Sequence, residues 1–183
     1  KAGIILAVLG GRIGLGRAEV SRFEGDNIER DENGNVIVGY DQFGNRVAKR
    51  KPYNVANGVA IITVTGSLVS RGAWIGADSG LTSYEGIQHQ LKRAMTDRDV
   101  HAVILDMHTP GGEALGCFET AAMVRDLASR KRTVAVVNGM AASGGYAIVS
   151  GASEIVTTEI GVSGSVGVLY VHADYSRALE NEG

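Results

Sequence analysis

Three runs of apolar residues constrain the fold more than any other feature of the sequence. They are Val59 to Val64, Ala102 to Asp106 and Thr133 to Val137, and none of them alternates between apolar and polar positions. Strands of this kind are typical of a parallel sheet that is buried on both faces. Repeated β-α-β units of this type predict an α/β fold in which helices cover a largely parallel sheet.

A helical pattern fills the segment between the first two strands. Thr82 and Glu85 have the spacing of a capping box, in which the two side chains bond to free N–H groups at the start of a helix. The apolar positions behind them recur at helical spacing and predict one buried face: Tyr84, Ile87, Leu91 and Met95.

A second helix is expected after the next strand, with Cys117 as a small buried residue on it. The basic cluster Arg130 to Arg132 would offset the negative end of this helix's dipole. Further strands are predicted over 154–157 and 165–171, and a last helix over 174–182. The apolar side of the second helix is predicted to contain Leu115, Phe118, Ala122 and Leu127.

Residues 1–52 differ from the rest and are predicted to form an N-terminal extension, with residues 53–183 as the core. The segments 31–35 and 41–45 resemble Asn-Gly turns and bracket Val36 to Val38, which predicts a β-hairpin. We expect the basic stretch Arg46 to Lys51 to be a solvated linker, with a processing site as the alternative. The glycine-rich segment 10–16 is expected to be a flexible loop.

Composition excludes several classes of function. The chain has 183 residues and a net charge of −2, so no nucleic acid is expected as a partner. No run reaches the roughly 20 apolar residues that a membrane span needs. The short run Ile4 to Leu9 is expected to dock as an N-terminal helix or strand rather than to act as a signal peptide. The single cysteine, Cys117, excludes an internal disulfide.

Two glycine-rich turns at strand ends indicate a candidate active site. Ser143 follows the third strand in the run Asn138-Gly-Met-Ala-Ala-Ser-Gly-Gly-Tyr146, which predicts a strand, a tight turn and the start of a helix. The second strand ends at His108-Thr-Pro-Gly-Gly112. Ligands of parallel sheets gather at the carboxyl ends of strands, so a nucleophile and flexible backbone donors would meet there.

Serine needs a base, and the sequence does not identify one. His89 and His101 are expected to have surface or packing roles, whereas His108 lies beside the second glycine-rich turn. His172 with Asp174 is the best formal partner for a Ser-His-Asp arrangement. Ala141 stands where the G-x-S-x-G motif has its first glycine, so the elbow of an α/β-hydrolase is not expected.

Three motifs resemble those of the S49 peptidases, the signal peptide peptidase A family. They are Leu105-Asp-Met-His-Thr-Pro-Gly-Gly112, Ala141-Ala-Ser-Gly-Gly-Tyr146 and Val162-Ser-Gly-Ser-Val-Gly-Val168. The stretch from Arg71 to Gly86 is similar to the branch of phage capsid assembly proteases. The resemblance runs from about Gly58 to the end of the chain and implies a ClpP/crotonase-like fold of repeated β-β-α units.

The resemblance also implies roles for individual residues. Ser143 would be the nucleophile of a Ser/Lys dyad, and the N–H groups of Gly112 and Gly144 would form the oxyanion hole. No metal and no cofactor are implied. The dyad lysine of short family members lies downstream of the last motif, but here no lysine follows Lys131. Nothing marks Lys92 or Lys131 as buried, so we expect a truncated chain that is inactive alone, with its lysine beyond Gly183.

The implied function is a serine endopeptidase that cleaves scaffold or capsid polypeptides during phage head maturation. The family also implies a homo-oligomeric ring, located in the host cytoplasm or the prohead. Association with the bacterial membrane is the alternative if missing segments carry an anchor. Two other functions stay open: a crotonase-like acyl-CoA enzyme that uses the same backbone donors, and a non-catalytic structural component of the capsid.

Overall fold

The computed structural model describes residues 26–72, 80–167, 172 and 174–182. The predictions for segments 4–9 and 10–16 lie outside these residues. The elements in chain order are β1 (Asp26–Ile28), β2 (Val38–Tyr40), β3 (Arg46–Ala48), β4 (Arg50–Ala56), β5 (Val59–Thr65), β6 (Ser67–Val69), β7 (Leu81–Ser83), α3 (Tyr84–Thr96), β8 (Ala102–Thr109), α4 (Cys117–Arg130), β9 (Arg132–Ala142), α5 (Gly144–Val149), β10 (Glu154–Thr157), β11 (Val162–Gly164) and α6 (Ser176–Glu182).

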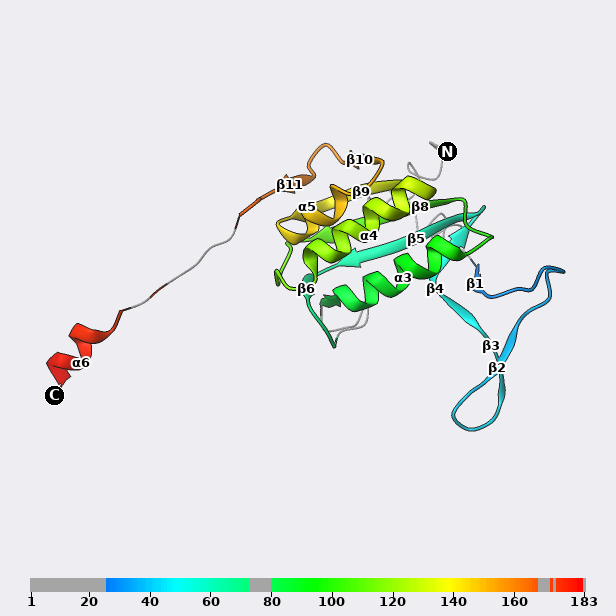
Figure 1. Ribbon diagram of the computed structural model, residues 1–183, viewed down its shortest axis with the longest axis horizontal. Helices are drawn as coiled ribbons and strands as arrows, with labels where there is room; N and C mark the ends of the chain where they lie inside the picture. The colour runs from blue at the N-terminus through cyan, green and yellow to red at the C-terminus, as the bar shows by residue number, and fades with distance from the viewer. Residues whose placement is uncertain (1–25, 73–79, 168–171, 173, 183) are drawn as a thin grey trace.

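A seven-stranded sheet forms the body of the protein. Its order is β1-β4-β5-β8-β9-β10, and β11 pairs with the last residues of β9. The strands β5, β8, β9, β10 and β11 are parallel, whereas β1 and β4 are antiparallel to their neighbours. The helices α3, α4 and α5 lie together on one face of this sheet (Figure 1). The α/β fold with a largely parallel sheet flanked by helices is therefore confirmed.

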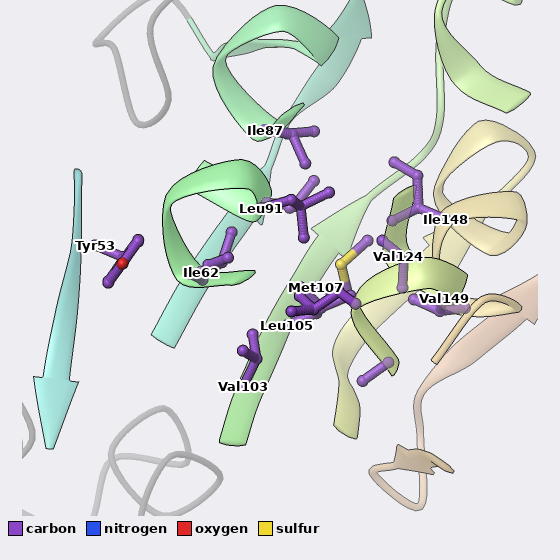
Figure 2. Packing of buried hydrophobic residues seen from close by; sticks show 14 of the residues in the cluster. Tyr53, Ile62, Ile87, Leu91, Val103, Leu105, Met107, Val124, Ile148 and Val149 are labelled. Carbon is purple, nitrogen blue, oxygen red and sulfur yellow. The ribbon is translucent and has the colours of Figure 1, made fainter. Parts of the chain in front are cut away.

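The main core lies between the sheet and these helices. Figure 2 shows Leu105 and Met107 of β8 pointing toward Leu91 of α3 and Val124 of α4. All four side chains are fully buried. Burial of one such side chain contributes about 1.5–3 kcal/mol, so the unalternating apolar strands fix the position of the helices above them. A smaller apolar cluster, with Ile104, lies on the opposite face of the sheet.

Helix α3 begins one residue later than the capping-box pattern predicts. Ser83 is the N-cap, and its Oγ accepts a hydrogen bond from the N–H of Gly86 at 3.1 Å. The hydroxyl of Thr82 instead donates to the carbonyl of Thr65 at 2.6 Å. The predicted face is otherwise correct, because Tyr84, Ile87 and Leu91 are fully buried and Met95 is half-buried.

Of the predicted apolar side of α4, only Leu127 is buried, and Ala122 is exposed. Leu115 precedes the helix and is 69% exposed, and Phe118 is 74% exposed. Apolar residues lie on more than one side of this helix, so periodicity alone does not decide which side is buried. The side that the helix turns inward packs against α3 and α5. The residues that it buries are Cys117, Thr120, Ala121, Val124 and Leu127.

The expected linker over 46–51 is strand instead, because these residues form β3 and the start of β4. Lys51 is only 8% exposed, and its ammonium group lies 2.8 Å from carboxylate oxygens of both Asp97 and Asp99. The predicted turns are present: Asp31 Oδ1 accepts hydrogen bonds from the N–H groups of Asn33 and Asn35. The division near residue 52 stays a prediction, although β4 crosses that position.

The C-terminal elements follow the sequence only in part. Strand β10 has the predicted bounds, whereas β11 ends at Gly164, before the strand predicted over 165–171. Of that segment, residues 165–167 are not strand and the rest lie outside the described residues. Helix α6 begins at Ser176 and lies apart from the sheet (Figure 1). No helix in the described ranges is long and apolar enough to cross a membrane.

Candidate active site

Ser143 joins the end of β9 to the start of α5, as the strand-turn-helix pattern predicts. It is the N-cap residue of α5, with φ 52° and ψ −119°. A residue with a Cβ atom rarely has a positive φ, and this pair of angles also lies outside the left-handed helical region. Such strain persists only where the surrounding structure enforces it, and it is concentrated at functional sites. The backbone of Ser143 therefore favours a functional role.

Backbone hydrogen bonds hold the Ser143 turn on both sides. The N–H of Ser143 donates to the carbonyl of Gly164 at 2.8 Å, and the N–H of Ala147 donates to the carbonyl of Ser143 at 3.0 Å. The hydroxyl does not cap α5 and has no hydrogen-bond partner among the described residues. The side chain is half-buried, so it is held in place but is available to a ligand or a base.

Gly144 is the first residue of α5, so its N–H has no acceptor within the helix. A Cβ atom at this position would lie 2.6 Å from Tyr84 Oη and 3.3 Å from Cys117 Sγ. The thiol of Cys117 is 3.7 Å from the carbonyl oxygen of Gly144, to which it donates. The Gly144 peptide is thus packed closely on one side, and only glycine fits there.

Gly112 forms an isolated parallel bridge with Leu68 of β6. In this bridge the N–H of Leu68 donates to the carbonyl of Gly111 at 2.8 Å, and the N–H of Glu113 donates to the carbonyl of Leu68 at 2.9 Å. The residue between two such bonds turns its own N–H away from the partner strand. The N–H of Gly112 therefore faces away from β6.

Gly111 connects the two turns, and its role was not predicted from the sequence. Its φ is 93°, and a Cβ atom there would lie 2.7 Å from Ser143 Cβ and 2.9 Å from the nitrogen of Gly144. The Pro-Gly-Gly turn is therefore in direct contact with the Ser143 turn. The structure brings Ser143, Gly112 and Gly144 together, while the catalytic roles that the resemblance implies stay predictions.

Histidine is not positioned to act on Ser143 within the described part of the chain. His108 lies on the face of the sheet opposite to α5, because side chains alternate along β8 and Met107 points into the core. Its Nδ1 is 3.0 Å from the carbonyl oxygen of Asn138. His172 is exposed, and Asp174 accepts a hydrogen bond from the N–H of Ser176 at 2.9 Å. His89 and His101 are exposed on α3 and at the opposite end of β8.

Two lysines that are partly or fully buried lie at the wrong end of the sheet. Lys131 directly precedes β9, whereas Ser143 directly follows it. The strand has 11 residues, which at about 3.3 Å per residue is about 36 Å. Lys51 is held by Asp97 and Asp99 beside the amino end of β8. Lys92 is exposed on α3. None of these lysines is placed to take a proton from Ser143.

The expectation for Lys131 needs a correction. Its ammonium group does not interact with its own helix but donates to the carbonyls of Ala94 and Asp97, both at 2.7 Å, at the C-terminal end of α3. The side chain is half-buried, and burial lowers the pKa of Lys131, although the charge of Asp97 opposes the shift. Lys131 therefore stabilises the end of a neighbouring helix.

Lys51 is buried but is held in its charged form. Burial alone would lower the pKa of Lys51, but hydrogen bonds and charge from Asp97 and Asp99 raise it above the ordinary value. A lysine acts as a general base only in its neutral form, so this group is unsuited to that role. Among the described residues, no group of three or more His, Cys, Asp or Glu side chains is placed to hold a metal ion.

Comparison with known proteins agrees with the motifs. Residues 125–183, which include Ser143, match the model of peptidase family S49. Over 183 residues the chain is 34% identical to the capsid assembly protease C of Escherichia phage lambda, covering 100% of this chain and 41% of that protein. It is 38% identical over 131 residues to the head-tail preconnector protein GP5 of Enterobacteria phage P21, covering 72% of this chain and 26% of that protein. The chain thus spans less than half the length of both relatives.

Solved structures were also found that resemble the chain. An enoyl-CoA hydratase/isomerase family member is 21% identical, with a TM-score of 0.45, over 57% of this chain and 46% of that chain. A ClpP1 mutant from Listeria monocytogenes is 16% identical, with a TM-score of 0.35, over 50% of this chain and 46% of that chain. On the family model and the two phage relatives, the chain belongs to peptidase family S49.

Proposed function

We propose that the chain carries the nucleophile and the oxyanion hole of a serine endopeptidase. The single observation that carries this proposal is the backbone of Ser143, with φ 52° and ψ −119° and a hydroxyl that no described residue engages. The adjacent glycines supply two backbone N–H groups without side chains that would obstruct a substrate. Membership of family S49 supports the same chemistry.

The reaction begins when Ser143 Oγ bonds to the carbonyl carbon of the scissile peptide and a base accepts the hydroxyl proton. The carbonyl oxygen becomes an oxyanion, and the N–H groups of Gly112 and Gly144 donate to it. One such donor is typically worth about 3 kcal/mol of barrier. When the C–N bond breaks, the leaving amine takes the proton from the base, and an ester on Ser143 remains.

Water completes the reaction. It attacks the ester carbon while the same base takes a proton from the water, and the oxyanion forms again between the two glycines. The bond to Ser143 Oγ then breaks, and the oxygen recovers a proton from the base. The products are a free carboxylic acid and the original serine. The base therefore accepts and returns one proton in each half of the reaction.

The base is a lysine outside the described residues. The ammonium groups of Lys51 and Lys131 already bind oxygen atoms at the other end of the sheet. A free lysine has a pKa of about 10.4, so an effective base needs a site that lowers this value toward roughly 7–8. The resemblance to family S49 supports a lysine from a segment downstream of the last motif.

The substrates are scaffold or capsid polypeptides of a phage head. This assignment rests on the relatives, which are named a capsid assembly protease and a head-tail preconnector protein. We propose the prohead or the host cytoplasm as the location of the protein. A homo-oligomer is the assembly that we propose from the same resemblance.

The test is cleavage by the complete gene product during co-expression with the capsid and scaffold genes of the same phage. Ser143→Ala should abolish cleavage, whereas Ser150→Ala should leave it unchanged. Ser150 is the matched control, because its exposed hydroxyl donates only to the carbonyl of Ala147 at the far end of α5. Cleavage that survives in Ser143→Ala would refute the proposal. Turnover of an acyl-CoA thioester that does not depend on Ser143 would favour the crotonase-like function instead.

A further inference from the structure

Tyr84 is buried between the two turns of the candidate site. It is the first residue of α3, and its side chain is 1% exposed. Buried tyrosines usually place their hydroxyl against a hydrogen-bond partner. Here the hydroxyl donates to the carbonyl of Glu113 at 2.7 Å. Glu113 directly follows Gly112, so this bond attaches α3 to the turn that carries the first backbone donor.

The same oxygen atom also packs against the second donor. A Cβ atom on Gly144 would lie only 2.6 Å from Tyr84 Oη, so the hydroxyl lies directly above the Cα of Gly144. The ring packs against the start of α4 as well, because a Cβ on Gly116 would lie 3.1 Å from Tyr84 Cβ and Cδ2. One side chain therefore contacts the segments that carry both proposed oxyanion donors.

We infer that Tyr84 is a positioning residue, which fixes the separation of the N–H groups of Gly112 and Gly144 by binding Glu113 and packing on Gly144. This inference rests on the proposed function, since it concerns the oxyanion hole. A backbone donor stabilises an oxyanion only over a narrow range of distance, about 2.7–3.1 Å. A small displacement of either turn therefore weakens catalysis without preventing the substrate from binding.

The neutral hydroxyl suits this role. Burial raises the pKa of Tyr84, and nearby Cys117 and Glu113 raise it further, so the phenol keeps its proton. A protonated phenol is a permanent donor to the Glu113 carbonyl. The effect of Tyr84 on the rate should therefore not depend on pH in the range where the enzyme works.

The chain offers a matched control. Tyr53 is 4% exposed, and its hydroxyl donates to Asp97 Oδ2 at 2.9 Å, at the other end of the sheet from Ser143. Tyr53→Phe and Tyr84→Phe each remove one hydroxyl and one hydrogen bond from a buried tyrosine. Both should lower stability to a similar extent, and only Tyr84→Phe should change the oxyanion hole.

The experiment compares both variants in the complete gene product, with a peptide substrate and with hydrogen exchange followed by mass spectrometry. Tyr84→Phe should lower kcat about tenfold, leave KM within about twofold and keep the shape of the pH profile. Amide hydrogens in peptides covering 109–116 and 142–148 should exchange faster than in the wild type. Tyr53→Phe should change neither kcat nor exchange in these two segments.

Each outcome has a distinct meaning. Unchanged exchange in both segments, or a kcat equal to that of Tyr53→Phe, overturns the inference while Ser143→Ala still confirms the peptidase. A change confined to KM also overturns it, because positioning of the oxyanion donors acts on the transition state. If the wild type and Ser143→Ala are equally inactive, the proposed function fails and a role of Tyr84 in catalysis fails with it.

Discussion

Replacing Ser143 by glycine should make the protein more stable than replacing it by alanine. Both substitutions remove the hydroxyl, which has no hydrogen-bond partner among the described residues, so its loss should change the free energy of unfolding by less than about 0.5 kcal/mol. Alanine keeps the Cβ atom and so keeps the strain of φ 52° and ψ −119°. Glycine has no Cβ and adopts positive φ without strain.

The magnitude follows from two opposing terms. A residue held in a sparsely populated backbone region costs about 1–3 kcal/mol, and glycine removes this cost. Glycine also makes the unfolded chain more flexible, which costs about 0.4–1 kcal/mol. The net gain of Ser143→Gly over Ser143→Ala is therefore about 1.3 kcal/mol at the midpoints of the two terms, within a range of about 0–2.6 kcal/mol. For a protein of this size, each kcal/mol shifts Tm by about 2–4 °C.

The assay is thermal unfolding of the complete gene product, followed by circular dichroism at one protein concentration. Asn57→Gly provides the control. Asn57 also has a positive φ, of 50°, but it lies in the two-residue Asn-Gly turn between β4 and β5, where asparagine is well tolerated. This change should not raise Tm. The reasoning is refuted if Ser143→Gly melts at or below the temperature of Ser143→Ala.

Two further predictions concern the opposite ends of the sheet. Gly112→Ala should lower kcat at least a hundredfold, because the added Cβ would lie 2.0 Å from the carbonyl oxygen of Leu68 and would displace the Gly112 N–H. Circular dichroism should show that this variant stays folded. The control Gly39→Ala should retain full activity, because its Cβ would meet only Lys49, at 3.5 Å. Asp97→Asn should make the free energy of unfolding depend less on pH in acid. Burial alone would raise the pKa of Asp97, but hydrogen bonds from Lys51, Asp99 and Tyr53 lower it below 3.8. The contribution of Asp97 to stability is therefore complete above about pH 4. It is lost as pH falls through the lowered pKa. A urea titration at several pH values measures this effect, and equal acid sensitivity of the variant and the wild type would contradict it.

The parts of the fold that follow from the sequence are those that depend on neighbouring residues. The buried strands β5, β8 and β9 are continuous runs of β-branched and other apolar residues, and these patterns identify a strand locally. The turn at Ser143 is similarly local, because glycines surround a single serine between a strand and a helix. The structure places that serine at the expected junction.

The features that the sequence analysis missed depend on contacts between distant segments. Lys51 looks like part of a solvated basic stretch, but its partner Asp99 lies 48 positions further along the chain. The bond from Tyr84 to Glu113 spans 29 positions. The buried side of α4 depends on which helix lies next to it. Local periodicity contains none of this information, so the fold class could be predicted and these contacts could not.

The two ends of the sheet differ in the kind of groups that they contain. At the amino ends of β8 and β9, the charged side chains of Lys51, Asp97 and Lys131 attach α3 to the sheet. At the carboxyl ends, the site around Ser143 consists of backbone N–H groups and glycines, and the buried side chains of Tyr84 and Leu68 lie beside it. A carboxylate beside the proposed oxyanion donors would accept hydrogen bonds from them and compete with the oxyanion. The Tyr84 hydroxyl instead donates its proton to the Glu113 carbonyl. Substitutions in the charged network should therefore change stability without changing kcat, whereas substitutions around Ser143 should change kcat as well as stability.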